Sequence, residues 1–398
     1  MKKNPENYDA DNVFIETVSR IYNAEASVNG PEMIKRGEID EATIGSDILD
    51  SWLADDTTKD MVSMDRPNTN YTYFYMFNFC PLPHNFSNAT VDGLDAEYEP
   101  ENWAKAINST NFRKAFLYGI NNAVTLAVQA PEGYENYKLN TITPPSFCAN
   151  SEGVDYLQCG DLANITEFFD EAKAKEYRDA AVEELTAAGA TFPIKVQLPY
   201  NPSSVDWDKQ CQVLKQQLES VLNDGFNFID IIITAGPSDG FLSTVRRNGK
   251  FCFLLCNWGA DYSDPQTESD PFYQAKGDRG SRYAFLRTGV EDGYITGETA
   301  DAVLNYMNAI EEATAITEDI DARYDAFANA EASLINNALV VPMGMSVPKV
   351  SGYPPELLGG PVRFHRLLQQ APQGHPCAGS LRFHGRVRGQ PRRPLNFT

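Results

Sequence analysis

Hydrophobic residues follow two alternating periods along the central part of the chain. Between Phe169 and Trp258, apolar positions recur at helical spacing in three segments and at strand spacing in three others. The predicted helices cover 169–188, 206–222 and 241–247, and the predicted strands cover 192–200, 226–234 and 251–258. Nearly every residue of 226–234 is apolar, as is typical of a strand covered on both faces. This alternation predicts an α/β fold with right-handed crossovers between parallel strands.

The flanking regions repeat the two periods less regularly. Alternating aromatic residues predict a strand over 71–79, and apolar spacing predicts further elements on both sides. These are helices over 111–120, 299–314 and 321–338 and a strand over 339–345. The chain has 398 residues, of which 42% are hydrophobic, which is enough for a large core and two domains. No apolar run is long enough to cross a bilayer as a helix.

The net charge of the chain argues against anionic binding partners. The formal net charge is −22, which disfavours binding to nucleic acid or anionic lipid because their phosphates would repel the chain. The final segment 361–398, called the basic tail here, holds seven arginines and no acidic residue. Its prolines would interrupt a helix, and its leucines show no sustained period. We expect this tail to be disordered, to carry no function and to result from a shifted reading frame.

Cysteine and histidine usage argues against metal chemistry. The seven cysteines include no CxxC pair, and the histidines stand at no zinc spacing, so we expect no metal and no cofactor. Cys148 and Cys159 flank a short polar loop and would pair in an oxidising compartment, although we favour free buried thiols. The N-terminus has a basic start without an apolar segment behind it, so it is not a secretory signal.

Five short segments carry a resemblance to a known family. They are Lys3–Asp9 (KNPENYD), Arg36–Asp40 (RGEID), the predicted helix from Phe112 to Asn121, Asn257–Pro265 (NWGADYSDP), and Ala330–Glu331 leading to Val340–Met343. Each motif alone is weak. In this order, they resemble the oligopeptide-, dipeptide- and nickel-binding receptors of bacterial ABC importers, which form solute-binding protein family 5. The resemblance covers about residues 1–350.

The resemblance implies a type II periplasmic-binding-protein clamshell, in which two α/β lobes close over an extended peptide. We expect a partial first lobe with a hinge strand in 1–78, a largely complete ligand-binding lobe in 79–338, a return segment in 339–360, and then the basic tail. The implied protein is a monomeric, non-catalytic receptor that captures oligopeptides outside the cytoplasmic membrane and delivers them to the importer's permease subunits. Relative to the family, the chain is expected to start partway through the first lobe.

Candidate ligand-binding residues cluster at the end of the predicted strand 251–258. Trp258 and Asp261 stand at its carboxyl end, where α/β sheets usually hold ligands. In the family, the matching Asp pairs with the peptide's α-ammonium group and the matching Trp lines a side-chain pocket. A carboxylate suits an ammonium group because the charge-assisted hydrogen bond is short and directional. The predicted site is completed by Asn257, Tyr262 and Arg247.

A purely structural interpretation of these residues also stays open. Trp258 would then be a core aromatic residue, and Asp261 a turn residue before Asp264–Pro265. Arg246 and Arg247 stand at the C-terminal end of a predicted helix, where cations favour the helix dipole without any ligand.

Two rival functions remain. Gly236–Gly240 (GPSDG) matches the G-x-S-x-G elbow of an α/β-type serine hydrolase, with Ser238 as nucleophile. Every histidine after Ser238 lies in the basic tail, so that serine lacks a positioned base, and helix capping explains the same residues. The second rival is a non-catalytic structural protein of the cell surface. It fits the acidic composition and the four Asn-x-Ser/Thr sequons at Asn85, Asn88, Asn108 and Asn164.

Overall fold

The chain forms two compact units in the computed structural model. The described residues are 1–13, 15–63, 71–86, 89–131, 133–204, 206–277, 283, 285–348, 350–354 and 379–384. The first unit comprises Met1–Pro67, Ser203–Val205 and Lys349–Thr398, and the second comprises Asn68–Pro202 and Asp206–Pro348. The boundaries predicted after residues 78 and 338 therefore differ from the observed division, because two strands assigned to the first lobe belong to the second unit.

Those two strands build the central sheet of the second unit. Strands β4 (Tyr71–Phe77), β9 (Phe253–Gly259) and β10 (Val340–Met345) form an antiparallel sheet in the order β10-β4-β9. Strand β4 lies in the middle, and five of its residues, Thr72 and Phe74 to Phe77, are buried. The chain therefore enters the second unit through β4 and leaves it through β10, next to each other in one ladder.

A second, parallel pair of strands confirms the α/β prediction. Strands β7 (Ile194–Tyr200) and β8 (Ile229–Ala235) pair in parallel and are joined by helix α7 (Trp207–Leu222). The expectation that β9 continues this parallel ladder is wrong, because β9 pairs along its whole length with β4. Just before β9, the Cys252 N–H donates to the Gln197 carbonyl at 3.0 Å, which links the two sheets.

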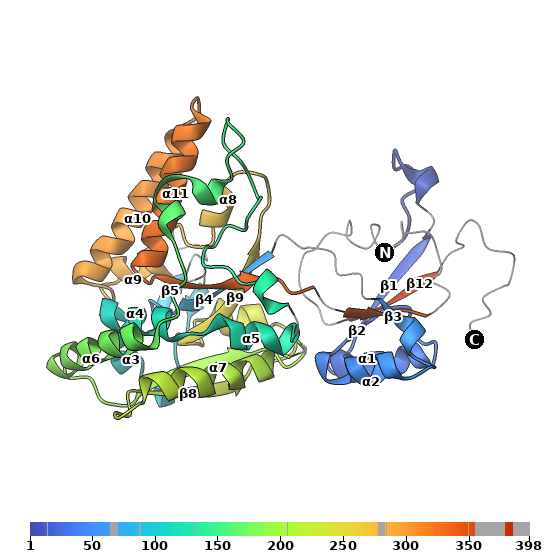
Figure 1. The fold of residues 1–398 in the computed structure, drawn as a ribbon, viewed down its shortest axis with the longest axis horizontal. Helices are drawn as coiled ribbons and strands as arrows, with labels where there is room; N and C mark the ends of the chain where they lie inside the picture. Colours follow the sequence, from blue (N-terminus) through green and yellow to red (C-terminus); the bar gives the residue numbers. More distant parts are fainter. Residues whose placement is uncertain are drawn as a thin grey trace, which may run out of the picture. The chain divides into compact units, whose positions relative to one another are not determined.

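Helices cover both sheets of the second unit. Figure 1 shows α10 and α11 side by side above the central sheet, and α7 alongside β8. The helices of this unit are α3 (Pro100–Asn108), α4 (Thr110–Gly119), α5 (Asn122–Gln129), α6 (Glu171–Ala187), α7, α8 (Gln266–Ser269), α9 (Leu286–Glu291), α10 (Gly297–Ala315) and α11 (Ile320–Asn336). In the part of the chain that the structure describes, no helix is long and apolar enough to cross a membrane.

Short elements complete the second unit. They are the β5–β6 hairpin (His84–Phe86 and Ala89–Val91), the 3-10 turns Ala96–Tyr98, Tyr134–Asn136, Tyr156–Gln158 and Gly160–Asn164, and the π-helical turn η7 (Leu242–Arg246). All helices and strands predicted from the hydrophobic pattern in this unit are present, with ends that shift by a few residues.

A buried arginine ties three helices of the second unit together. Arg113 on α4 is fully buried and donates to the Ile107 carbonyl at 2.6 Å, to Thr299 Oγ1 at 3.0 Å and to the Asn337 carbonyl at 3.2 Å. These partners come from the end of α3, from α10 and from the turn after α11. Burial lowers the pKa of the Arg113 guanidinium to about 9.

The first unit is smaller. Its elements are η1 (Ala10–Asn12), β1 (Thr17–Tyr22), α1 (Ala26–Lys35), β2 (Ala42–Ile44), α2 (Ser46–Ala54), η2 (Lys59–Met61), β3 (Val62–Ser63), β11 (Val350–Gly352) and β12 (Gly379–His384). Strands β2, β11 and β3 form one antiparallel sheet. Two small apolar clusters, one around Ile34 and one around Trp52, pack against it.

Part of the basic tail is ordered. Strand β12 pairs antiparallel with β1, with Thr17 opposite His384 and Tyr22 opposite Gly379. The prediction that the whole tail is disordered is therefore wrong for these six residues. Leu381 and Phe383 alternate with polar residues there, which is the period of a strand, and the backbone groups of β1 provide hydrogen-bond partners. The remaining tail residues lie outside the described part of the chain.

The cysteines are free thiols wherever the structure describes them. Cys148 is half-buried and Cys159 is buried, and neither forms a disulfide. Burial raises the pKa of the Cys148 thiol to about 12, so it is protonated and unreactive at neutral pH. Cys377 lies outside the described residues.

Candidate functional site

Four of the five predicted site residues lie at the end of β9 or in the loop that follows it, whereas Arg247 follows η7. Asn257 and Trp258 are the last side-chain-bearing residues of this strand and pair with Tyr73 and Thr72 of β4. The strand ends at Gly259, where a Cβ atom would lie 2.8 Å from the ring of Tyr71. Glycine is needed there because the aromatic ring passes directly over the backbone.

An arginine fixes the loop that follows β9. Arg323 on α11 donates to both carboxylate oxygens of Asp264, with Nε 3.0 Å from Oδ2 and Nη2 2.9 Å from Oδ1. Its Nη1 also donates to the carbonyls of Ala313 and Ile316, where α10 ends. This bidentate pair holds the loop against α10 and α11, so the loop has a defined conformation without a ligand.

Asp261 lies in this fixed loop with its carboxylate exposed. Its backbone N–H donates to Thr267 Oγ1 at 3.1 Å, which orients the residue. Among the described residues, no hydrogen-bond donor or ion-pair partner contacts the Asp261 carboxylate. Tyr262 beside it is 47% exposed. The carboxylate is therefore positioned by the backbone and open to a cationic group from solvent.

Trp258 belongs to an aromatic and cationic cluster. Its ring meets the ring of Tyr283 edge-on, with centroids 5.8 Å apart and an interplanar angle of 89°. The guanidinium carbon of Arg246 lies 3.9 Å from the centroid of the same Tyr283 ring. Trp258 is only half-buried, and its buried Nε1 has no hydrogen-bond partner within the part of the chain that the structure describes. Both the structural and the ligand-binding interpretations of Trp258 thus have support, since the ring packs but keeps an unused donor.

The two adjacent arginines have different environments. Arg247, the predicted ligand contact, is exposed, whereas Arg246 is 9% exposed and turned against Tyr283. Burial raises the pKa of the Tyr283 hydroxyl, and the charge of Arg246 counteracts this effect. The arginine that joins the Trp258 cluster is therefore Arg246, and the sequence offers no signal that distinguishes the two.

A buried acid lies near Asp261 in the sequence and influences the same loop. Glu268 on α8 is 2% exposed, and neither of its carboxylate oxygens has a hydrogen-bond partner among the described residues. Burial, together with the nearby charges of Glu331 and Asp261, raises its pKa to about 8. Glu331 on α11 is also buried, but it accepts hydrogen bonds from the backbone of Ile142 and Thr143 and from the Thr143 hydroxyl. Sequence reasoning missed Glu268, because a glutamate in a short polar segment is normally exposed.

The G-x-S-x-G segment has a structural explanation. It connects β8 to η7, as predicted for Gly236–Gly240. A Cβ atom at Gly236 would lie 2.7 Å from the ring of Phe241, and Gly240 has a φ of +70°. His84, the only histidine whose side chain the structure describes, contacts the Leu82 carbonyl and the ring of Phe285. Both glycines are thus required by the turn itself.

One of the sequons is occupied by internal hydrogen bonds. The Asn108 amide donates to the carbonyls of Ala104 and Tyr294 and accepts from the Thr296 N–H. A side chain used in this way is not free to carry a glycan, which weakens the argument for a glycosylated surface protein.

Comparison with known proteins gives a consistent picture. The family model for "Bacterial extracellular solute-binding proteins, family 5 Middle" matches residues 1–280. The chain is 26% identical over 362 residues to the oligopeptide-binding protein AliB of Streptococcus pneumoniae, covering 86% of this chain and 54% of AliB. It is 24% identical over 361 residues to AliA of the same organism, covering 85% of this chain and 53% of AliA. The chain thus spans about half the length of the curated relatives it matches.

Solved structures agree on the fold. The substrate-binding domain of an oligopeptide ABC transporter from Bacillus anthracis matches with a TM-score of 0.59 and 17% identity, over 83% of this chain and 53% of that chain. OppA of Listeria monocytogenes bound to peptide matches with a TM-score of 0.56 and 16% identity, over 83% of this chain and 52% of that chain. The predicted α/β fold of the periplasmic-binding-protein type is confirmed.

Proposed function

The chain belongs to family 5 of the bacterial extracellular solute-binding proteins, and on this premise we propose that it captures oligopeptides outside the cytoplasmic membrane for an ABC importer. The curated relatives it resembles are named as oligopeptide-binding proteins, which supports peptide as the ligand class. The role requires a peptide ligand and permease subunits as partners, a monomeric receptor, and no catalytic group.

The proposal rests mainly on the environment of the Asp261 carboxylate. Its carboxylate is exposed and unpaired within the described residues, yet its backbone is fixed through Thr267 and the Asp264–Arg323 pair. A pre-oriented, unpaired carboxylate binds an ammonium group without first breaking an existing ion pair or ordering a loop. The neighbouring half-buried face of Trp258 offers apolar area without selecting one side chain.

The test compares one peptide in two forms. Calorimetry would measure binding of an alanine-rich pentapeptide with a free N-terminus and of the same peptide with an acetylated N-terminus. Acetylation removes the positive charge, so we expect it to weaken binding at least a hundredfold. A hundredfold change in affinity corresponds to about 2.7 kcal/mol.

The matching variant is Asp261→Asn, with Asp301→Asn on α10 as the control because Asp301 is also an exposed acid. We expect Asp261→Asn to lose the preference for the free peptide and Asp301→Asn to keep it. Equal affinity of the unaltered chain for both peptide forms would contradict the role of Asp261.

A further inference from the structure

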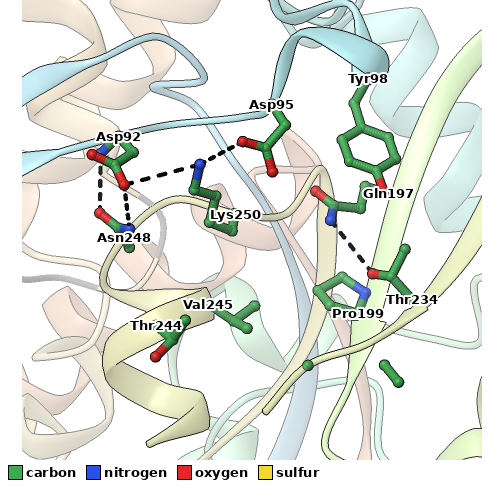
Figure 2. A pocket seen from close by; sticks show the side chains of 12 residues that line it. Asp92, Asp95, Tyr98, Gln197, Pro199, Thr234, Thr244, Val245, Asn248 and Lys250 are labelled. Atoms are coloured by element: carbon green, nitrogen blue, oxygen red, sulfur yellow. Dashed lines mark hydrogen bonds and ion pairs between the residues drawn. The ribbon is translucent and has the colours of Figure 1, made fainter.

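The second unit contains a cleft that none of the predicted site residues lines. It has a volume of about 440 Å³ and is formed by β7, β8, η7, the turn before β9 and the segment from Asp92 to Tyr98. Figure 2 shows the polar side chains that converge on it: Asp92, Asp95, Gln197, Thr234, Asn248 and Lys250. The volume lies in the range of sites that hold small ligands.

The donors in this cleft are already used. Lys250 Nζ lies 2.6 Å from Asp95 Oδ1 and 4.0 Å from Asp92 Oδ2. The Asn248 amide donates to Asp92 Oδ2 at 2.8 Å, and its Oδ1 accepts from the Asp92 N–H at 3.0 Å. Lys250 and Asn248 are thus engaged with the two acids, so the cleft offers no free cation to an anionic ligand.

One acceptor among the lining residues has no hydrogen-bond partner in the described part of the chain. Gln197 on β7 is 7% exposed, and its Nε2 donates to Thr234 Oγ1 at 3.4 Å. Its Oε1 is buried and accepts no hydrogen bond from any residue that the structure describes. A buried acceptor without a donor destabilises the folded state, and a ligand that brings an N–H group into the cleft would relieve this cost.

The charge of the cleft points in the same direction. Asp92 and Asp95 stand against the single cation Lys250, so the lining carries one excess negative charge. Each carboxylate has lone pairs beyond those that its present partners use. The cleft therefore favours a ligand that brings hydrogen-bond donors and a positive charge.

We propose that this cleft is a second ligand site, which binds a small organic cation carrying an ammonium or guanidinium group. Its N–H groups reach Gln197 Oε1 and the free lone pairs of Asp92 and Asp95, while the apolar carbons of the ligand lie against Pro199 and Val245. The site is independent of Asp261 and of the proposed peptide capture.

The experiment uses agmatine as the probe and the full chain, with binding measured by calorimetry and by ligand-observed NMR. Agmatine carries both an ammonium and a guanidinium group and no carboxylate, so it cannot imitate a peptide C-terminus. We expect millimolar or tighter binding that Gln197→Leu weakens at least tenfold, because leucine keeps the volume and removes the acceptor. Gln197→Glu should tighten binding, because it adds a negative charge at the same point.

A surface variant keeps the test meaningful if the Gln197 variants fold poorly. Asp95→Asn removes one carboxylate and releases the cation of Lys250, so it should weaken agmatine binding at least tenfold. The matched control is Asp224→Asn, an exposed acid that pairs with Lys175 elsewhere in the same unit and should leave binding unchanged.

Three results would overturn the proposal. The first is the absence of any agmatine binding at millimolar concentration. The second is an equal loss in Asp95→Asn and Asp224→Asn, which would reveal nonspecific attraction to an acidic protein. The third is loss of binding in Asp261→Asn with none in Asp95→Asn, which would place agmatine in the peptide site and leave the peptide-capture proposal intact.

Discussion

Glu268 gives the sharpest prediction, because its carboxylate is buried and accepts no hydrogen bond from the described residues. The perturbation is Glu268→Gln, which keeps the shape of the side chain and makes its neutral state permanent. Two further acids face Glu268: Glu331 from α11 and Asp261 from the loop after β9. Both disfavour a negative charge on Glu268, in addition to the cost of its burial.

The magnitude follows from the pKa. Burial and these neighbours raise the pKa of Glu268 from 4.5 to about 8. One pKa unit is worth about 1.4 kcal/mol, so the ionised form costs the folded state about 5 kcal/mol. Because the folded pKa is above the unfolded one, the folded state binds more protons between these two values. The contribution of Glu268 to stability is therefore complete below pH 4.5 and is lost as the pH rises to about 8.

The assay is urea unfolding of the unaltered chain and of Glu268→Gln at several values between pH 5 and pH 9. The two proteins should have similar free energies of unfolding at pH 5. At pH 9 the variant should be more stable by several kcal/mol, because only the unaltered chain pays for a buried charge. Glu312→Gln, at an exposed position on α10, is the control and should follow the unaltered chain throughout. A stability difference that stays constant from pH 5 to pH 9 would refute the reasoning.

Three further predictions concern the framework around the site. Arg113→Met should lower the free energy of unfolding by about 3–5 kcal/mol, because it leaves the carbonyls of Ile107 and Asn337 without this donor. The control Lys114→Met should change the free energy of unfolding by less than about 1 kcal/mol in the same urea titration. Gly236→Ala should lower the free energy of unfolding by about 1–3 kcal/mol, because the new Cβ would meet the ring of Phe241. The chain and its Ser238→Ala variant should both hydrolyse p-nitrophenyl acetate only at the background rate. Turnover that depends on Ser238 would support the hydrolase interpretation. Arg323→Gln should weaken peptide binding about tenfold in calorimetry, because it releases the loop that holds Asp261. The control Arg36→Gln removes an exposed ion pair with Glu38 and should leave the peptide affinity unchanged.

Local signals made most helices and strands of the second unit predictable. Helix α6, for example, begins where Asp170 accepts a hydrogen bond from the Lys173 N–H, and it ends before Gly189, which has a φ of +68°. Both residue types are helix-terminus signals that a sequence shows directly. The partner of β9 was not predictable, because its pairing with β4 joins residues far apart in sequence and leaves no local trace.

The candidate site divides in the same way. Trp258 and Asp261 were found because they belong to one short motif at the end of a strand. Tyr283, which packs against Trp258, comes from a distant segment with no pattern of its own. The choice between Arg246 and Arg247 depends on the side-chain directions in a π-helical turn, which hydrophobic periodicity does not reveal.

The adjacency of β4 and β10 determines how the second unit can be cut out of the chain or permuted. In their antiparallel ladder, Thr72 lies opposite Met345. The start of the first strand of the second unit therefore lies beside the end of its last strand. Apart from Ser203–Val205, that unit is one uninterrupted cassette whose entry and exit points adjoin. Such a cassette can be excised at two neighbouring cuts, closed with a short peptide and reopened at a surface turn, which makes it a natural substrate for circular permutation and for exchange between related proteins.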